Sequence, residues 1–446
     1  MKLFGTDGVR GLANVYPITA EVALKLGKAA AIVLSKNKNK PLFLIGKDTR
    51  RSCYMLENAL TAGLTSMGAD VLLVGPVPTP GVAHLVRSFA ADAGIMVSAS
   101  HNPYSHNGIK FFDSKGLKLP DEIEEKIENL VLNNPLSTDH ITGEGIGKAK
   151  RIDDAQGRYI EFVKSSIQNT KLKGLKIVLD CANGAAYKVA PQILRELGAE
   201  LIVINNNPNG LNINLDSGAL HPNVLKTAVL GHNADLGLTL DGDADRIYMV
   251  DEKGKILDGD DITAIIAIDY LKKGKLKNKT VVMTEYTNLA FKKLIERNGG
   301  KFVKGLNGDR YVIEEMLKHD YNLGGEYSGH IIVSDYNSTG DGLIAGLQVL
   351  KIIKEQNKKL SELSSLEKFP QELISVNVTK KTPLSKLSNV QKAIKNANNI
   401  LKENGRLLVR YSGTENVCRI MVEGKNKELI KKIANDIATE IKKEVN

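Results

Sequence analysis

The sequence predicts an α/β protein with three related α/β domains, whose sheets are mixed but mostly parallel, and a C-terminal α+β domain, arranged around a central cleft. Three observations predict this class. The 446 residues are enough for about three domains. Strand-like and helix-like patterns alternate along most of the chain. One strand–helix–strand plan occurs three times and gives way to a different pattern near residue 367.

Each repeat begins with a short run of strand-forming residues that ends in polar turn residues, as a buried parallel strand does. These runs are residues 43–46, 177–179 and 281–283. A helical pattern follows each run, at residues 54–67, 186–197 and 289–298. Each pattern stops at a glycine, the residue preferred just after a helix C-terminus. The glycines are Gly68, Gly198 and Gly299, and each leads into a second apolar strand.

Every repeat continues with a second helix and a third strand. The helices are expected at residues 81–90, 222–230 and 311–318, and the third strands within 93–100, 234–245 and 322–330. This alternation favours parallel sheets with helices on both faces. Because ligands bind beyond the carboxyl ends of such strands, the loops after the third strands are expected to carry the chemistry.

The last part of the chain follows another plan. After a proline-containing segment at residues 367–371, the order is strand, helix, strand, loop, strand, helix, with clear members at 407–410, 419–423 and 428–445. The predicted domains are residues 1–150 with the first loop, 151–255 with the second loop, 256–367 with the third loop, and 368–446.

The first loop, residues 98–103, reads Ser-Ala-Ser-His-Asn-Pro. A hydroxyl such as that of Ser100, next to hydrogen-bond donors such as His101, can carry a phosphoryl group with its three acceptor oxygens. The alternative is a serine that merely caps a helix or stabilises a turn. The chain lacks a G-x-S-x-G sequence, which argues against acyl transfer.

The second loop carries carboxylates at alternate positions, Asp241, Asp243 and Asp245. Charges so close together repel one another and call for a cation, and oxygen ligands select Mg²⁺ or Ca²⁺. An EF-hand is the competing interpretation, with Glu252 at position 12, but Arg246 stands where its loop requires glycine. Mg²⁺ is therefore favoured over a calcium-binding module or a solvated acidic turn.

Two further segments are suited to binding a sugar phosphate. The third loop, residues 324–330, offers a carboxylate and a hydroxyl, Glu326 and Ser328, to adjacent sugar hydroxyls, although a glycine-requiring turn explains it equally well. In the last domain, Arg410 and Arg419 bracket a Ser-Gly-Thr turn, residues 412–414. Guanidinium donors and backbone N–H groups grip phosphate in this way, while a structural turn with surface arginines is the alternative.

Together these motifs resemble the α-D-phosphohexomutase superfamily along essentially the whole chain. The matching segments, in order, are GTDGVRG, IGKDTR, SASHNP, NGIKFF, DCANGA, DGDADR, GDRYV, GEYSGH, TGDGL and RYSGTE. The chain is most similar to bacterial members that interconvert glucosamine 6-phosphate and glucosamine 1-phosphate for amino-sugar nucleotide and cell-wall precursor synthesis. The alternative is the same isomerase chemistry on mannose or glucose phosphates. One departure is Tyr327, where the pattern has glutamine.

The resemblance implies a role for each candidate residue. Ser100 would be the phosphorylated serine and, with Asp241, Asp243 and Asp245, would hold one Mg²⁺ per active site. Glu326 and Ser328 would hold sugar hydroxyls. The phosphate that is not transferred would be bound by Arg410, Ser412, Gly413, Thr414 and Arg419. The reacting phosphoryl group would be surrounded by Arg10, His101, Lys110 and Arg246. A sugar 1,6-bisphosphate would be both intermediate and activator.

The resemblance also implies a proton carrier, because the attacking sugar hydroxyl must lose its proton. Lys110 is the first candidate for this acid/base, and His330 is the second. A lysine serves only if its pKa falls towards neutrality. Lys110 could instead be a charged partner of the phosphoserine without a proton role.

Charge and composition limit the partners. The net charge is +10, but only 5% of residues are aromatic and tryptophan is absent, so a small anionic substrate is favoured over nucleic acid. A non-catalytic protein that binds phosphosugars or nucleic acid is disfavoured by the intact serine, aspartates and arginines. No apolar run approaches the ~18 residues of a membrane helix. The three cysteines offer no disulfide framework, so we expect a cytoplasmic protein. We also expect a monomer or homodimer without a membrane partner.

Overall fold

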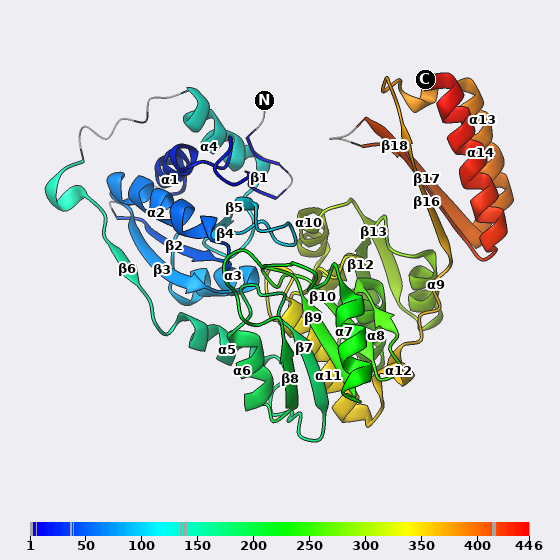
Figure 1. Ribbon diagram of the computed structural model, residues 1–446, viewed down its shortest axis with the longest axis horizontal. Coiled ribbons are helices and arrows are strands. Elements are labelled where there is room, and N and C mark those ends of the chain that lie inside the picture. Colours follow the sequence, from blue (N-terminus) through cyan, green and yellow to red (C-terminus); the bar gives the residue numbers. More distant parts are fainter. Residues whose placement is uncertain are drawn as a thin grey trace. The chain divides into compact units, whose positions relative to one another are not determined.

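The computed structural model describes residues 3–5, 7–35, 38, 40–133, 136, 141–412 and 416–445. The chain divides into two compact units, Met1–Tyr286 with Asn298–Ser365, and Thr287–Arg297 with Leu366–Asn446. Three mixed α/β sheets lie in the first unit and one antiparallel sheet lies in the second (Figure 1). The predicted fold class is confirmed, while the predicted limits of the four domains stay a prediction.

The first sheet has the strand order β1-β5-β4-β2-β3-β6. Its strands are β1 (Val9–Leu12), β2 (Leu42–Lys47), β3 (Asp70–Pro76), β4 (Ala93–Val97), β5 (His106–Asp113) and β6 (Ala149–Arg151). The helices of this region are α1 (Ala20–Leu34), α2 (Ser52–Ser66), α3 (Thr79–Ser88), α4 (Asp121–Asn133) and the short η1 (Gly143–Gly145). Strand β2 is apolar because it is central: Phe43 and Ile45 are fully buried against the helices.

The second and third sheets have the orders β11-β10-β9-β7-β8 and β13-β12-β14-β15. Their strands are β7 (Lys176–Asp180), β8 (Glu200–Ile204), β9 (Leu236–Leu240), β10 (Ile247–Asp251), β11 (Ile256–Leu257), β12 (Thr280–Thr284), β13 (Lys301–Gly305), β14 (Leu323–Gly325) and β15 (Ile331–Val333). The helices that flank them in the first unit are α5 (Ala155–Ser165), α6 (Val189–Glu196), α7 (Pro222–Gly231), α8 (Gly259–Lys272), η2 (Lys277–Lys279), α10 (Asp309–His319), α11 (Gly342–Gln356) and α12 (Leu360–Leu363).

The three predicted repeats are present and share one strand arrangement, β5-β4-β2-β3, β10-β9-β7-β8 and β15-β14-β12-β13. In each, the first strand pairs in parallel with the second and the third, and the fourth strand returns antiparallel to the third. The glycines after the first helices have positive φ, 83° at Gly68, 92° at Gly198 and 78° at Gly299, as the predicted helix ends require. Each candidate loop thus joins a parallel third strand to an antiparallel fourth strand.

The second unit contains a three-stranded antiparallel sheet of order β16-β18-β17, with helices α13 and α14 on one face (Figure 1). The elements are β16 (Gln371–Asn377), η3 (Leu384–Lys386), α13 (Ser388–Leu401), η4 (Lys402–Asn404), β17 (Gly405–Tyr411), β18 (Val417–Gly424) and α14 (Lys427–Val445), together with α9 (Leu289–Arg297). Its core packs Ile420 and Val422 of the sheet against Val390 and Ile433 of the helices. Among the described residues, no helix is both long enough and apolar enough to span a membrane.

Candidate active site

The β9–β10 loop gathers three carboxylates in a buried position. Carboxylate oxygens of Asp241, Asp243 and Asp245 all lie within 4.8 Å of one another. Burial and the two neighbouring carboxylates raise the pKa of Asp241 well above its ordinary value. Burial also acts to raise the pKa of Asp243, but Lys110 and the hydroxyl of Thr79 outweigh it and hold that pKa below its ordinary value. Lys110 thus outweighs burial at Asp243, whereas at Asp241 burial and the neighbouring carboxylates outweigh Arg246 and the hydrogen bond from Ser100.

The donor set fits a divalent cation. The second carboxylate oxygens of Asp243 and Asp245, both Oδ1, are buried and accept no hydrogen bond from any described residue. Buried polar atoms without a partner are costly, so each marks a place where a ligand is needed. Carboxylate oxygens are the ligands that Mg²⁺ prefers. These residues are therefore suited to hold the predicted Mg²⁺.

Ser100 lies against this carboxylate group, as the sequence predicts. Its Oγ donates a hydrogen bond of 2.6 Å to Oδ2 of Asp241, and the residue is 1% exposed. The loop that carries Ser100 joins β4 to β5, so the first and second repeats bring equivalent loops together. A side chain at Gly242 would place its Cβ 2.6 Å from the carbonyl oxygen of Ser100, so this approach requires glycine.

Lys110, on β5, is the buried cation of the site. Its Nζ lies 2.9 Å from Oδ2 of Asp243, 3.1 Å from Oδ2 of Asp7 and 3.7 Å from Oδ2 of Asp245. Burial acts to lower the pKa of Lys110, but these three carboxylates outweigh it and raise the pKa above its ordinary value. Lys110 is therefore held protonated in this arrangement.

Two arginines flank the same carboxylates. Arg10, on β1, forms an ion pair with Asp7. The Nε of Arg246 lies 3.9 Å from Oδ1 of Asp245, and its backbone N donates 3.2 Å to Oδ1 of Asp241. Although burial opposes it, the carboxylates raise the pKa of Arg246, and Glu326 of the third loop is among them. Both guanidiniums thus remain charged next to Ser100 and its loop.

The two candidate histidines lie in different surroundings. Nδ1 of His101 is 3.3 Å from Oγ of Ser100, and burial together with Arg246 and Arg10 lowers the pKa of His101 to about 4. It is therefore neutral at pH 7 and contributes a hydrogen bond, not a charge. His330 is buried, with Nε2 3.3 Å from Oδ2 of Asp309 and 3.9 Å from Oδ2 of Asp245.

Sequence reasoning assigned no role to several residues that complete the site. Asp7 accepts from Arg10 and Lys118, and Lys118 also forms an ion pair with Asp309, the partner of His330. Asp7 and Asp309 lie in the GTDGVRG and GDRYV segments, which was a usable signal, whereas nothing in the sequence marked Lys118. Charges of alternating sign therefore link Lys110 to His330 through the interior.

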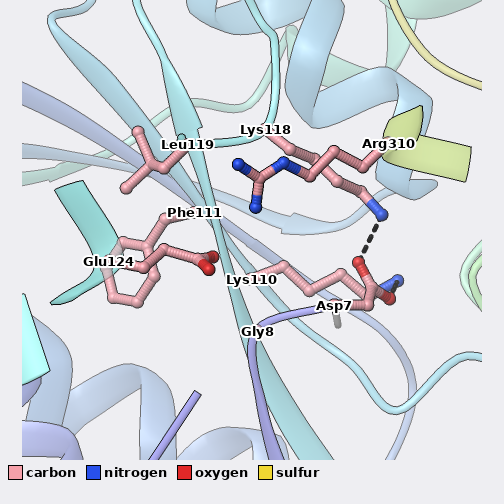
Figure 2. A pocket seen from close by; sticks show the side chains of 8 residues that line it. All are labelled: Asp7, Gly8, Lys110, Phe111, Lys118, Leu119, Glu124 and Arg310. Carbon is pink, nitrogen blue, oxygen red and sulfur yellow. Dashed lines mark hydrogen bonds and ion pairs between the residues drawn. The ribbon is translucent and has the colours of Figure 1, made fainter. Parts of the chain in front are cut away.

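A small cavity of about 10 Å³ lies beside Lys110 and Lys118 (Figure 2). Figure 2 shows the ion pair between Lys118 and Asp7 on one side, while Phe111, Leu119 and Glu124 line it as well. Burial raises the pKa of Glu124 to about 7, with Arg310 opposing the shift. This carboxyl group on α4 is therefore neutral in the folded protein at mildly acidic pH, although its ordinary pKa is near 4.3.

Replacing Glu124 by glutamine is expected to stabilise the protein above pH 7. The folded state holds the Glu124 proton more tightly than the unfolded state does, so this residue costs stability as the pH rises from about 4.3 to about 7, and the cost persists above that range. Because solvent partly screens the Glu124 charge, we expect the free energy of unfolding to rise by about 1 kcal/mol at pH 8 and to stay unchanged at pH 4.5. Thermal unfolding of Glu124→Gln at both pH values measures it. Exposed Glu122→Gln is the control, and an equal gain at both pH values would contradict the explanation.

The third loop holds its two polar side chains together. Oγ of Ser328 donates 3.0 Å to Oε2 of Glu326, and the backbone N of Gly308 donates 3.1 Å to Oε1. The side chains are thus fixed as one acceptor and one hydroxyl, an arrangement that can bind neighbouring sugar hydroxyls. Tyr327 between them is 46% exposed.

The predicted phosphate-binding turn belongs to the second unit. Arg410 of β17 and Arg419 of β18 are direct partners across the antiparallel pair, so their side chains leave the same face of the sheet. Ser412 is buried, and its backbone N donates 2.9 Å to Val417 O, while its carbonyl accepts 2.8 Å from Nζ of Lys381. Gly413 and Thr414 lie outside the described residues. Two facing guanidiniums favour an anion between them.

Four family models match consecutive parts of the chain. They are phosphoglucomutase/phosphomannomutase alpha/beta/alpha domain I at residues 1–137, domain II at 157–254, domain III at 258–369, and the C-terminal domain at 373–440. The fold is thus three α/β domains followed by a C-terminal domain. The site is a buried serine–aspartate centre formed by loops of the first and second repeats. The chain belongs to the phosphoglucomutase/phosphomannomutase family.

Individual relatives cover nearly the whole chain. It is 53% identical over 440 residues to the phosphoglucosamine mutase of Citrifermentans bemidjiense, covering 98% of this chain and 97% of that protein. It is 52% identical over 446 residues to the phosphoglucosamine mutase of Geotalea uraniireducens, covering 100% and 98%. A solved structure of a family member from Burkholderia thailandensis has a TM-score of 0.82 at 24% identity, covering 100% and 98%, which shows the shared fold.

Proposed function

We propose that this chain interconverts glucosamine 6-phosphate and glucosamine 1-phosphate, as a phosphoglucosamine mutase. The observation that carries the proposal is the 2.6 Å hydrogen bond from Ser100 to Asp241 within a buried group of three aspartates. A hydroxyl that carries a phosphoryl group in this place would lie beside a cation site whose carboxylates also contact Lys110 and Arg246, while Arg10 pairs with the neighbouring Asp7. The choice of an amino sugar is supported by the names of relatives that are 51–53% identical over 97% of their length.

The proposed reaction is a relay in two transfers. The phosphoryl group leaves phosphorylated Ser100, and its phosphorus forms a new bond to the free hydroxyl of the bound sugar monophosphate, which gives a sugar bisphosphate. The bisphosphate turns around, and its other phosphate passes back to Ser100. A bound Mg²⁺ neutralises charge on the transferring group. Arg10 and Arg246 donate to its oxygens, and neutral His101 donates or accepts a hydrogen bond beside Ser100.

The rest of the substrate would be held by the third loop and by the last domain. Glu326 and Ser328 bind sugar hydroxyls, and they must be able to hydrogen-bond to the sugar in both of its orientations. Arg410 and Arg419, with Ser412, Gly413 and Thr414, bind the phosphate that is not being transferred. A single phosphate-binding site suffices, because the phosphate at either end of the sugar can occupy it while the other end reacts.

Lys110 is the proposed acid/base, with His330 second. The carboxylates around Lys110 raise its pKa and keep it protonated, whereas acid/base catalysis requires a lysine pKa that falls towards neutrality. Lys110 therefore carries the proton but holds it tightly in this arrangement. To accept a proton from the sugar hydroxyl, Lys110 must first lose its own, and this requires that the negative charge of the surrounding carboxylates be partly neutralised so that its pKa falls. The competing role, a charged partner of the phosphoserine, requires only that the ammonium stay in place.

Replacing Lys110 by methionine is expected to lower kcat by about 10²- to 10⁴-fold, because the variant has no proton to give. Lys110→Arg separates the two roles, since it keeps the positive charge but does not lose a proton at working pH. We expect steady-state assays to show a comparable loss in both variants. A methionine variant with nearly unchanged kcat ends the acid/base assignment, and a fully active arginine variant leaves only the charge role.

A coupled assay with glucosamine 6-phosphate, Mg²⁺ and a catalytic amount of sugar 1,6-bisphosphate tests the proposed function. We expect turnover, and a higher kcat/KM for the glucosamine phosphate than for the glucose or mannose phosphates. Equal or faster turnover of mannose 1-phosphate overturns the substrate and leaves the same chemistry on another hexose. No turnover of any of the three overturns the enzyme itself and favours a non-catalytic phosphosugar-binding protein.

Several expectations remain part of this proposal. The domain boundaries near residues 150, 255 and 367 are kept as predicted. The cysteines Cys53, Cys181 and Cys418 are free and buried, which suits the reducing cytoplasm that we propose as the compartment. The monomeric or homodimeric state also stays a prediction, which sedimentation or light scattering measures.

A further inference from the structure

The backbone of Ser100 is in an unusual conformation. Its φ is +52°, in the left-handed region that residues with a side chain seldom adopt. Such a conformation persists only when surrounding contacts impose it. The hydroxyl reaches Oδ2 of Asp241 from this backbone, so whatever holds the conformation also holds the hydroxyl in place.

Two side chains hold the loop by its carbonyl groups. The carbonyl oxygen of Ser100 accepts from Nη2 of Arg50 at 3.1 Å and from Nδ2 of Asn214 at 2.9 Å. The carbonyl oxygen of Asn102 accepts from the same two atoms, at 2.5 Å and 3.1 Å. Each donor atom thus bridges two carbonyls that lie on either side of His101. We call Arg50 and Asn214 the carbonyl clamp.

Both members of the carbonyl clamp are themselves fixed. Arg50 is fully buried and forms an ion pair with Asp48, whose other oxygen accepts 2.9 Å from the backbone N of Arg50. The backbone N of Asn214 donates 2.9 Å to Ala182 O. A rigid donor fixes the group it binds, whereas a mobile donor would follow it.

The carbonyl clamp draws on two repeats at once. Arg50 follows β2 of the first sheet, and Asn214 lies between β8 and α7 of the second-sheet region. A Cβ at Gly242 of the β9–β10 loop would lie 2.8 Å from Nδ2 of Asn214, so Asn214 packs against that loop as well as against Ser100. The donor atom of Asn214 therefore touches the serine loop and the aspartate loop together.

We propose that Arg50 and Asn214 are positioning residues for phosphoryl transfer, which keep the Ser100 oxygen aimed at the aspartate group without touching the substrate. The inference rests on the proposed function, because it concerns the same serine. We infer that the carbonyl clamp affects the rate of phosphoryl transfer to and from Ser100 and does not affect the binding of the sugar phosphate. A displacement of about 1 Å at a reacting atom is enough to cost 10²-fold in rate.

The test uses the full chain with Arg50→Lys and Asn214→Ala. Lysine keeps the buried charge next to Asp48 but cannot reproduce the fork that serves Asp48 and two carbonyls, and alanine removes the amide alone. Matched controls are Arg51→Lys, the exposed neighbour of Arg50, and Asn206→Ala, exposed in the loop that leads to Asn214. Each protein is assayed for kcat, KM and thermal unfolding. The rate at which glucose 1,6-bisphosphate adds a phosphoryl group to Ser100 is followed by intact mass.

We expect both clamp variants to lose about 10- to 100-fold in kcat and in the rate of Ser100 phosphorylation, with KM within about threefold of the parent and the controls unchanged. Folded variants with parental kcat and phosphorylation rate overturn the inference. So does a loss that tracks only the folded fraction, since that is a structural role. If Arg50→Lys fails to fold, Asn214→Ala decides. A parent that is never phosphorylated on Ser100 overturns the proposed function instead, so the two failures are distinguishable.

Discussion

Replacing Ser100 by alanine is expected to lower mutase turnover by about 10⁴-fold or more, because the residue that accepts and returns the phosphoryl group is lost. The hydroxyl is the group that donates to Oδ2 of Asp241 and lies 3.3 Å from Nδ1 of His101. Intact mass gives a second readout that does not depend on turnover. The parent is expected to show a fraction heavier by one phosphoryl group after incubation with sugar bisphosphate, and Ser100→Ala is expected to lack it.

The matched control for this variant is Ser105→Ala. Ser105 belongs to the same β4–β5 loop, and its hydroxyl contacts Nδ1 of His106 at 3.4 Å, not the aspartate group. It should keep both the activity and the heavier fraction. A Ser100→Ala protein that still gains the phosphoryl group, or that turns over at a rate close to the parent, shows that another residue carries the phosphate and removes the basis of the proposed relay.

The three-repeat fold could be predicted because its signals are local. Strand runs, helix periodicity and the terminal glycines Gly68, Gly198 and Gly299 are each contained in a few neighbouring residues. The site followed from one general rule, that ligands bind beyond the carboxyl ends of parallel strands. That rule points to the loops carrying Ser100 and Asp241, which the structure joins by a hydrogen bond.

Long-range partners could not be predicted in the same way. Lys118 and Asp309 are 191 positions apart and form a partly buried ion pair, and Asn214 lies 114 positions from the carbonyl that it binds. A lysine or an asparagine has no local pattern that names such a partner. The raised pKa of Glu124 could not be predicted either, because it depends on burial through the packing of α4 and not on the residues adjacent in sequence. The antiparallel strands β5 and β15 were also not expected, since one short apolar run does not reveal its direction.

Removing divalent cations is expected to abolish turnover, and Mg²⁺ is expected to restore it. The physical reason lies in the aspartate group: Oδ1 of Asp243 and of Asp245 are buried without a hydrogen-bond donor among the described residues, and burial with the neighbouring carboxylates raises the pKa of Asp241. A divalent cation relieves this repulsion, so Mg²⁺ should also raise the thermal unfolding temperature of the parent. Chelation followed by titration of Mg²⁺ measures both effects.

Asp245→Asn is the most informative variant in this group. Asp243 accepts hydrogen bonds from Lys110 and Thr79, so replacing it would disturb more than a cation site. Within the described chain, Asp245 has only longer ion-pair contacts, 3.7 Å to Lys110 and 3.9 Å to Arg246 and to His330. We expect Asp245→Asn to lose about 10²-fold or more in kcat and to lose the stabilisation by Mg²⁺. Asp216→Asn, an exposed position with the same change of charge, is the control. If the chelated parent turns over normally, or Asp245→Asn keeps the parental response to Mg²⁺, the aspartates do not form a catalytic metal site. Full activity with Ca²⁺ in place of Mg²⁺ contradicts the assignment of the ion, because Mg²⁺ requires near-ideal octahedral geometry whereas Ca²⁺ takes more ligands at longer distances.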